Sequence, residues 1–105
     1  MSGADNTSFT TRTTAVTTTL TNNDYILLVI GATGAVTVNL PAVATVQPGR
    51  NYTVYKDAAA QTITLDGAGA ELIDGAATTT LSAAGGIHAK RLVTDGLAWF
   101  TTDSF

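Results

Sequence analysis

Apolar residues alternate with threonine and other polar residues through most of the chain, in short runs separated by glycine, proline, asparagine or aspartate. Alternation with a period of two places one set of side chains on each face of a β-strand. The pattern predicts about eight short strands, and only residues 41–47 leave room for a helix. The runs that predict strands are residues 13–20, 25–30, 35–40, 51–56, 61–65, 71–73, 77–81, 87–93 and 97–101.

The run YILLVI at residues 25–30 differs from the others because every position in it is apolar. A strand with one face in water alternates, whereas a strand with both faces covered is continuously apolar. The sequence therefore predicts that both faces of this strand are covered.

Three Asp-Gly pairs, Asp66-Gly67, Asp74-Gly75 and Asp95-Gly96, lie between predicted strands. Asp-Gly is a strong hairpin signal, because glycine tolerates positive φ and aspartate bonds to its own turn. The first two pairs also offer carboxylates to calcium, but residues 68–70 between them provide only backbone carbonyls. We interpret the pairs as turns. The predicted fold class is all-β, a small antiparallel β-sandwich or barrel of about eight short strands.

The chain has 105 residues, of which 45% are hydrophobic and 12% charged, a composition that fits one folded domain. Residues 1–12 are mostly small and polar and predict a flexible N-terminal arm, and residues 13–105 predict a single β domain. There is no cysteine, and much of the apolar content is alanine, which adds little to a core. Stability is therefore expected to depend on dense β pairing and on subunit contacts, and the second favours an oligomer.

Charge and hydropathy argue against several classes of partner. The formal net charge of −3 disfavours nucleic acid, which needs a basic surface. No apolar run is long enough to span a membrane. The N-terminal residues lack the basic and apolar regions of a signal peptide.

Candidate catalytic residues are few. His88 is the only histidine, so one chain cannot build a histidine metal cluster, and Glu71 is the only glutamate. A carboxylate pair would need Glu71 with Asp66 or Asp74, and nothing in their spacing favours a pair over turns. Ser82 has no histidine and aspartate at a spacing typical of a catalytic triad. The sequence predicts no enzyme, no catalytic residue, no metal site and no cofactor.

Longer segments carry a resemblance to a known family. Residues 36–83 read VTVNLPAVATVQPGRNYTVYKDAAAQTITLDGAGAELIDGAATTTLSA, and residues 92–100 read LVTDGLAWF. This order resembles a module that recurs in tailed-bacteriophage tail fibres, head fibres and small capsid-decorating proteins. In that module V-T-V-x-L-P-A leads to P-G-R-x-Y-T-V-K-D, then to I-T-I-D-G-x-G-x-E-x-I-D-G-A-A-T, and L-x-S-D-G-x-x-W ends it.

The resemblance implies a virion structural protein, often trimeric, without catalysis. The module makes up nearly all of the chain, which favours a capsid cement or decoration protein that binds the outer surface of the assembled shell as a homotrimer and stabilises it. Its partners are then the major capsid protein and its own copies. Its location is the capsid surface of the virion, after synthesis in the host cytoplasm. The expected shell contacts are Phe9, Arg12, Thr13 and Thr17, and the expected trimer contacts are Tyr25, Leu27, Trp99 and Phe100.

Two other functions stay open. A tail-fibre or head-fibre module binds a host-surface receptor, with an aromatic side chain such as Tyr52, Tyr55 or Trp99 stacked on a sugar ring. An enzyme such as a depolymerase needs a carboxylate pair in a groove. A fibre module requires a partner chain to join the virion, whereas a cement protein binds the capsid directly.

Overall fold

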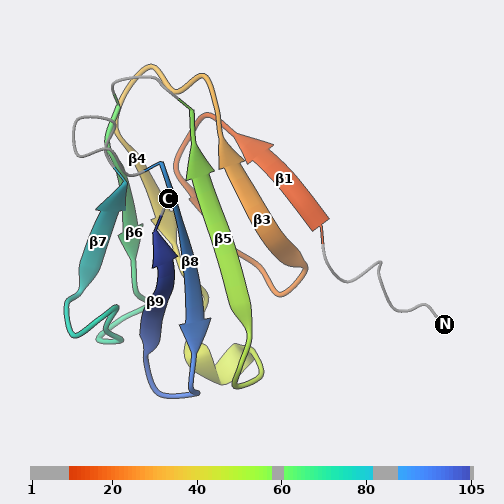
Figure 1. Ribbon diagram of the computed structural model, residues 1–105, viewed down its shortest axis with the longest axis vertical. Helices are drawn as coiled ribbons and strands as arrows, with labels where there is room; N and C mark the ends of the chain where they lie inside the picture. Colours follow the sequence, from red (N-terminus) through yellow and green to blue (C-terminus); the bar gives the residue numbers. More distant parts are fainter. Residues whose placement is uncertain (1–9, 58–60, 82–87, 105) are drawn as a thin grey trace, which may run out of the picture.

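The computed structural model describes residues 10–57, 61–81 and 88–104, which form nine strands in two sheets (Figure 1). This confirms the all-β prediction. The helical segment η1 (Val43–Thr45) is a single 3-10 turn. In spatial order the larger sheet contains β1 (Thr10–Thr14), β3 (Asp24–Val29), β5 (Asn51–Lys56), β8 (Ala89–Thr94) and β9 (Trp99–Ser104). The smaller sheet contains β2 (Thr18–Thr19), β4 (Val36–Asn39), β6 (Ile63–Asp66) and β7 (Thr78–Leu81).

The strand directions differ from the prediction. From β1 to β6, successive strands alternate between the two sheets, so that neighbours within each sheet run parallel. Only the pairings made by β7, β8 and β9 are antiparallel. The purely antiparallel prediction is therefore wrong, and neither sheet closes into a barrel. Turn residues signal a reversal of the chain, but they do not specify whether the next strand joins the same sheet or crosses to the other one.

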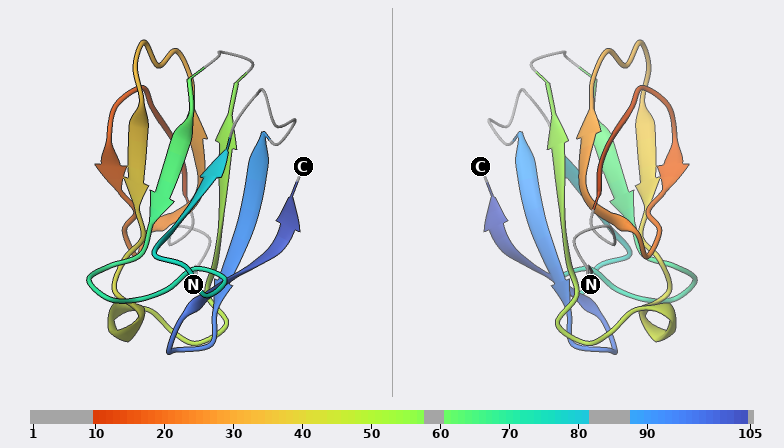
Figure 2. Two further views of the ribbon diagram at one scale, coloured as in Figure 1. Left: turned by 90° about the vertical axis from the view of Figure 1, so that its left-hand side faces the viewer. Right: turned by 90° about the vertical axis from the view of Figure 1, so that its right-hand side faces the viewer.

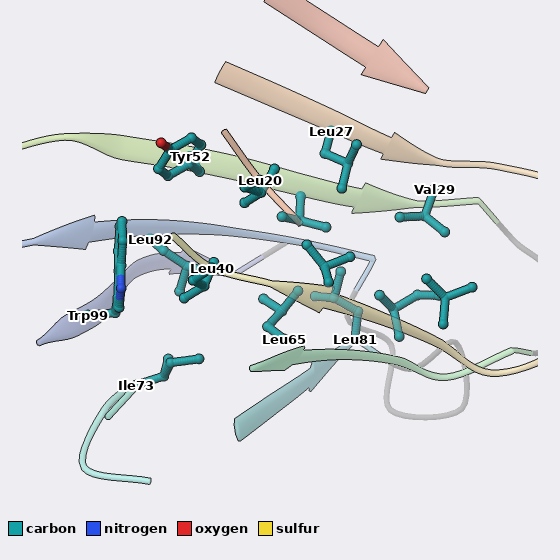
Figure 3. Packing of buried hydrophobic residues seen from close by; sticks show 14 of the residues in the cluster. Leu20, Leu27, Val29, Leu40, Tyr52, Leu65, Ile73, Leu81, Leu92 and Trp99 are labelled. Atoms are coloured by element: carbon teal, nitrogen blue, oxygen red, sulfur yellow. The ribbon is translucent and has the colours of Figure 1, made fainter. Parts of the chain in front are cut away.

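A hydrophobic core separates the two sheets. Figure 2 shows the sheets from the side as two layers, and Figure 3 shows the core side chains between them. The rings of Tyr52 and Trp99 lie 5.7 Å apart between their centres at one end of this core. Full burial of a leucine or valine contributes about 1.5–3 kcal/mol to stability, so the core stabilises both sheets together. Its members are Leu20, Leu27, Val29, Ala32, Val36, Val38, Leu40, Val43, Val46, Tyr52, Val54, Ile63, Leu65, Ile73, Leu81, Leu92 and Trp99.

The N-terminal part of the fold is organised differently from the prediction. Residues 10–12, assigned to the arm by the sequence, begin β1 and pair with β3, while residues 1–9 lie outside the described residues. Residues 13–20, predicted as one strand, contribute to both β1 and β2. Residues 71–73 form no strand of their own, because only Ile73 makes isolated bridges, to Ala76 and Trp99.

Candidate functional site

The outer face of the five-stranded sheet carries apolar side chains in register across neighbouring strands. Residues paired across strands share a face, and Leu28 pairs with Tyr55, which pairs with Ala89. Val93 and Phe100 pair in the same way on β8 and β9. The side chains that alternate with them along these strands and point into the core are Leu27, Val29, Tyr52, Val54, Leu92 and Trp99. We define the apolar face as Ile26, Leu28, Tyr55, Ala89, Val93 and Phe100.

The apolar face remains partly open in the described part of the chain. Tyr55 is 39% exposed and Phe100 is 43% exposed, whereas Ile26, Leu28 and Val93 are half-buried among their neighbours. In the continuously apolar run, Leu27 and Val29 are buried in the core, whereas Ile26 and Leu28 are half-buried and Tyr25 and Ile30 are exposed. The prediction that both faces of this strand are covered is therefore met only at Leu27 and Val29.

The outer face of the smaller sheet is polar. Thr37, Thr64 and Thr80 form one cross-strand row, and Asp66 pairs with Thr78 in the next. Threonine suits this position because its β-branched side chain favours a strand and its hydroxyl interacts with water. The outer face of the larger sheet differs from this one because it carries large apolar side chains, beside the polar residues Thr13, Thr53, Arg91 and Asp103. We define the threonine face as Thr19, Thr37, Asn39, Thr64, Asp66, Thr78 and Thr80.

One exposed ion pair lies on the same outer face as the apolar residues. Arg91 Nη1 donates to Asp103 Oδ2 over 2.9 Å, and Arg91 also pairs with Thr53 in the ladder. Both charged side chains are nearly half exposed. The paired strand residues of this face therefore carry one positive and one negative charge, which cancel.

A second ion pair, between Arg12 and Asp24, lies where β1 and β3 begin to pair. The Arg12 guanidinium donates from Nε to Oδ1 over 3.0 Å and from Nη2 to Oδ2 over 2.8 Å. It also donates to the Thr18 hydroxyl and to the Thr19 carbonyl on β2. One side chain therefore joins the edge strands of both sheets to β3.

Asp24 is only 2% exposed, and burial by itself would raise its pKa. Hydrogen bonds from the Arg12 side chain and the Thr21 backbone, with the Arg12 charge, outweigh burial and lower the pKa of this carboxyl. The hydrogen bond to Asp24 raises the pKa of Arg12. The pair therefore stays charged at neutral pH and serves to hold strands together.

Arg50 and Tyr52 fix the turn that leads into β3. Arg50 Nη1 donates to the carbonyl and side-chain oxygens of Asn22, and its Nη2 bonds to the carbonyl of Asp24. The guanidinium lies 4.5 Å from the centre of the Tyr52 ring, while the Tyr52 hydroxyl donates to the Thr21 carbonyl. Burial raises the pKa of that hydroxyl, against the effect of the Arg50 charge. This turn borders a pocket of about 610 Å³ lined by Asn22, Tyr25, Gln47, Pro48, Gly49, Arg50 and Asn51.

The second Asp-Gly pair forms a hairpin turn, as predicted. Asp74 has a φ of 53° and Gly75 a φ of 83°, and Ile73 and Ala76 exchange backbone hydrogen bonds around them. Positive φ at both central positions is the pattern of a type I′ turn. The Asp74 carboxylate accepts the backbone N–H and the hydroxyl of Thr101, at 2.8 and 2.6 Å. Its oxygens therefore bind the chain itself.

The third Asp-Gly pair is also a turn. Asp95 Oδ1 accepts the backbone N–H groups of Leu97 and Ala98, and these bonds lower the pKa of Asp95. Gly96 follows with a φ of 96°. The first pair differs, because Asp66 is still part of β6 and its Gly67 leaves the strand.

Among the described residues that were considered for catalysis, the Glu71 side chain binds the backbone. Both carboxylate oxygens of Glu71 accept the N–H of Val43, at 3.0 and 3.2 Å, next to η1. The His88 carbonyl accepts the N–H of Lys56. No three His, Cys, Asp or Glu side chains gather as a metal site within residues 10–57, 61–81 and 88–104. Ser82 lies outside the described residues.

Of the residues expected to contact the shell, Arg12 and Thr13 lie on β1. Phe9 lies outside the described residues, and the Arg12 guanidinium is bound to Asp24, Thr18 and Thr19. Thr13 is exposed and pairs with Leu28, so it extends the outer face of the larger sheet to its edge. Thr17 is exposed in the turn before β2, where its hydroxyl accepts the N–H of Thr37.

The residues expected at the trimer interface divide into two groups. Tyr25 is 40% exposed and Phe100 is 43% exposed, so both can meet another chain. Leu27 and Trp99 are fully buried in the core of the chain itself, and that assignment is corrected. Tyr52 is likewise buried, which removes it and Trp99 as stacking platforms for a sugar.

The sequence missed Ile26, Leu28 and Val93 as surface residues, although the unbroken apolar run at 25–30 gave a signal for the first two.

No protein-family model matches the chain, and no curated protein matches it at a significant level. In the part of the chain that the structure describes, no helix is long and apolar enough to cross a membrane.

Proposed function

We propose that the chain is a bacteriophage virion structural protein, a capsid cement or decoration protein that binds the outer surface of the assembled shell as a homotrimer and stabilises it. The observation that carries the proposal is the presence of two separate exposed surfaces on one small domain, the outer face of the larger sheet with Tyr55 and Phe100, and the N-terminal edge strand β1. A protein that assembles with itself and also binds a lattice needs two such separate surfaces. In this proposal the two open sheets form a β-sandwich, and the chain performs no catalysis.

The sequence resemblance supports the proposal together with the fold. The segments that resemble the virion module coincide with β4, β5, β6 and β7, and the LVTDGLAWF segment spans the turn between β8 and β9. These strands form a continuous part of both sheets. In this proposal the resembling segments make up one structural unit, and β1, β2 and β3 are added to it as parallel strands.

The shell contact in this proposal involves the N-terminal edge, with Phe9, Thr13 and Thr17 as contact residues and Arg12 as the residue that holds β1 in place. Binding to the assembled shell and not to free capsid protein stabilises the shell by mass action. Many copies on one capsid multiply the effect. The partner is the major capsid protein, at the capsid surface of the virion.

Co-sedimentation tests the proposal directly. Capsid shells depleted of this protein are mixed with the full chain, or with a variant that lacks residues 1–9, which leaves β1 and the Arg12–Asp24 pair intact. We expect the full chain to saturate the lattice and raise the melting temperature of the shell, and the shortened chain to bind more weakly. Failure of the full chain to bind depleted shells would contradict the proposal.

A fibre module that binds a host receptor is the second candidate, because of the pocket beside Tyr25. Its lining combines one exposed aromatic ring with the amide side chains of Asn22, Gln47 and Asn51, groups that suit a sugar ring and its hydroxyls. Adsorption of the purified chain to host cells, blocked by Tyr25→Ala, would favour this function. Shell binding that is unaffected by Tyr25→Ala would favour the first.

A further inference from the structure

We propose that the apolar face, formed by Ile26, Leu28, Tyr55, Ala89, Val93 and Phe100, is the surface through which copies of this chain associate. The inference deepens the proposed homotrimer and rests on that part of the proposed function, but it can be tested in solution without any capsid. It assigns the interface to one sheet face. The residues of that face take the place of Leu27 and Trp99, which are buried, as the expected contact residues.

The first argument is the composition of β3. Its run YILLVI is apolar at every position, which is the pattern of a strand covered on both faces. The core covers Leu27 and Val29, whereas Ile26 and Leu28 lie on the outer face and remain partly exposed. The threonine face of the smaller sheet shows what this chain places on a sheet surface that is left in water. The contrast indicates that the apolar face has a protein partner.

The second argument is charge. Each copy has a formal net charge of −3, so identical copies repel one another unless they meet through a neutral surface. On the apolar face, Arg91 and Asp103 supply one charge of each sign, 2.9 Å apart and at the β8–β9 side of the sheet. Such a face is electrostatically compatible with its own copy, whose Arg91 can approach the Asp103 of the first.

The third argument is shape. Large and small side chains lie side by side on this face, because Tyr55 pairs with Ala89 and Phe100 pairs with Val93. Ala89 is covered by its own chain, so the projecting rings of Tyr55 and Phe100 are the parts of this face that can pack against another copy. Buried aromatic side chains of this kind typically dominate the binding energy of an interface.

The size of the face sets the expected strength. Five strands about 4.8 Å apart, each of five or six residues at about 3.3 Å per residue, give a face of roughly 24 Å by 20 Å. The projected area is roughly 480 Å² per copy, below the roughly 600–1,000 Å² per partner of standard interfaces and in the range of weak, transient ones. We therefore expect association in the micromolar range in solution, and greater occupancy where a capsid lattice holds the copies close together.

Sedimentation equilibrium of the full chain tests the inference. We expect wild-type protein to form trimers that dissociate on dilution, and Tyr55→Asp and Phe100→Asp to be monomeric at the same concentrations. Thr80→Asp on the threonine face, where the paired residue is Thr64, is the matched control and should remain trimeric. Circular dichroism and the melting temperature of each variant show whether it is folded.

Each result decides a separate point. Two results would overturn the inference. One is a wild-type chain that is monomeric at high micromolar concentration, and the other is that folded Tyr55→Asp and Phe100→Asp variants keep their oligomeric state. A dimer that both substitutions disrupt would support the apolar face as the interface and contradict the trimer of the proposed function. Loss of shell binding with an intact trimer would contradict the cement function and leave the interface in place.

Discussion

Arg12 on the first strand of the larger sheet binds both carboxylate oxygens of Asp24 on the third strand of the chain, over 3.0 and 2.8 Å. The pair lies at the place where the register between β1 and β3 shifts, between Thr10 and Thr11. An irregular ladder supplies fewer regular backbone hydrogen bonds, so the ion pair substitutes for part of the pairing that the bulge removes. β1 is an edge strand, and this contact fixes its position.

We predict that Arg12→Ala destabilises the protein more than Arg91→Ala does. Removal of Arg12 leaves the buried Asp24 carboxylate without its cationic partner, and because the Arg12 side chain is 36% exposed we expect a loss of about 1–3 kcal/mol. The Arg91–Asp103 pair is exposed on both sides, so its loss should change stability by less than about 1 kcal/mol. Urea unfolding of both variants, in the background of a monomeric Phe100→Asp chain, measures the difference. Equal losses would contradict the structural role of Arg12.

The Asp24 pair also predicts the response to acid. The folded state lowers the pKa of Asp24, so the unfolded state binds the proton more readily as pH falls. The stability contributed by this carboxylate is complete above the unfolded pKa of about 3.9 and is lost as pH falls through the lower folded value. The urea midpoint of the wild type should therefore fall more steeply below about pH 4 than that of Asp24→Asn. Asp95, whose pKa is also lowered, titrates in both proteins and does not affect the comparison. Parallel curves would show that Asp24 does not govern this response.

Gly67 predicts a steric effect on stability. A Cβ built at this position would lie 2.3 Å from the carbonyl oxygen of Glu71, a backbone atom that cannot move away easily. Gly67→Ala should therefore destabilise the protein by about 1–3 kcal/mol, the range typical of overpacking. At Gly34 a Cβ would meet no atom within 4 Å and φ is not positive, so Gly34→Ala is the control and should be nearly neutral. Thermal unfolding that ranks the two variants equally would contradict this local geometry.

Trp99 predicts a spectroscopic result. It is the only tryptophan of the chain, and its side chain is fully buried by the chain itself. Its fluorescence should be blue-shifted and poorly quenched by acrylamide, both in wild-type oligomers and in the Phe100→Asp monomer. A red shift on dissociation of the oligomer would instead place Trp99 at the interface between copies.

The sequence predicted most of the strands because period-two alternation and turn chemistry act locally. β5 has the predicted limits, Asn51–Lys56, and the Asp74-Gly75 turn has the predicted conformation. Strand direction was not predictable in the same way, because it depends on which strands pair across the core. The alternation of strands between two sheets is a tertiary property that no local signal encodes.

The candidate site was less predictable for two physical reasons. In a continuously apolar strand the pattern does not show which face is inside, so Leu27 was assigned to a surface and Ile26 and Leu28 were not. The inward direction is set by the pairing with β1 and β5, which the sequence does not reveal. The Arg12–Asp24 pair was missed because residue 12 was assigned to a flexible arm and its partner lies in a later strand.

The alternation of β1 to β6 between sheets has a consequence for the order in which the chain folds. Each of the strands β1 to β4 pairs with the strand two positions later in the chain, and the strand between the two belongs to the other sheet. The antiparallel pair β8–β9 is closed by a short local turn and can form early, whereas the parallel ladders require larger loops to close first. During synthesis on the ribosome, the N-terminal strands therefore emerge first and remain without a complete hydrophobic core until the last third of the chain supplies Leu81, Leu92 and Trp99.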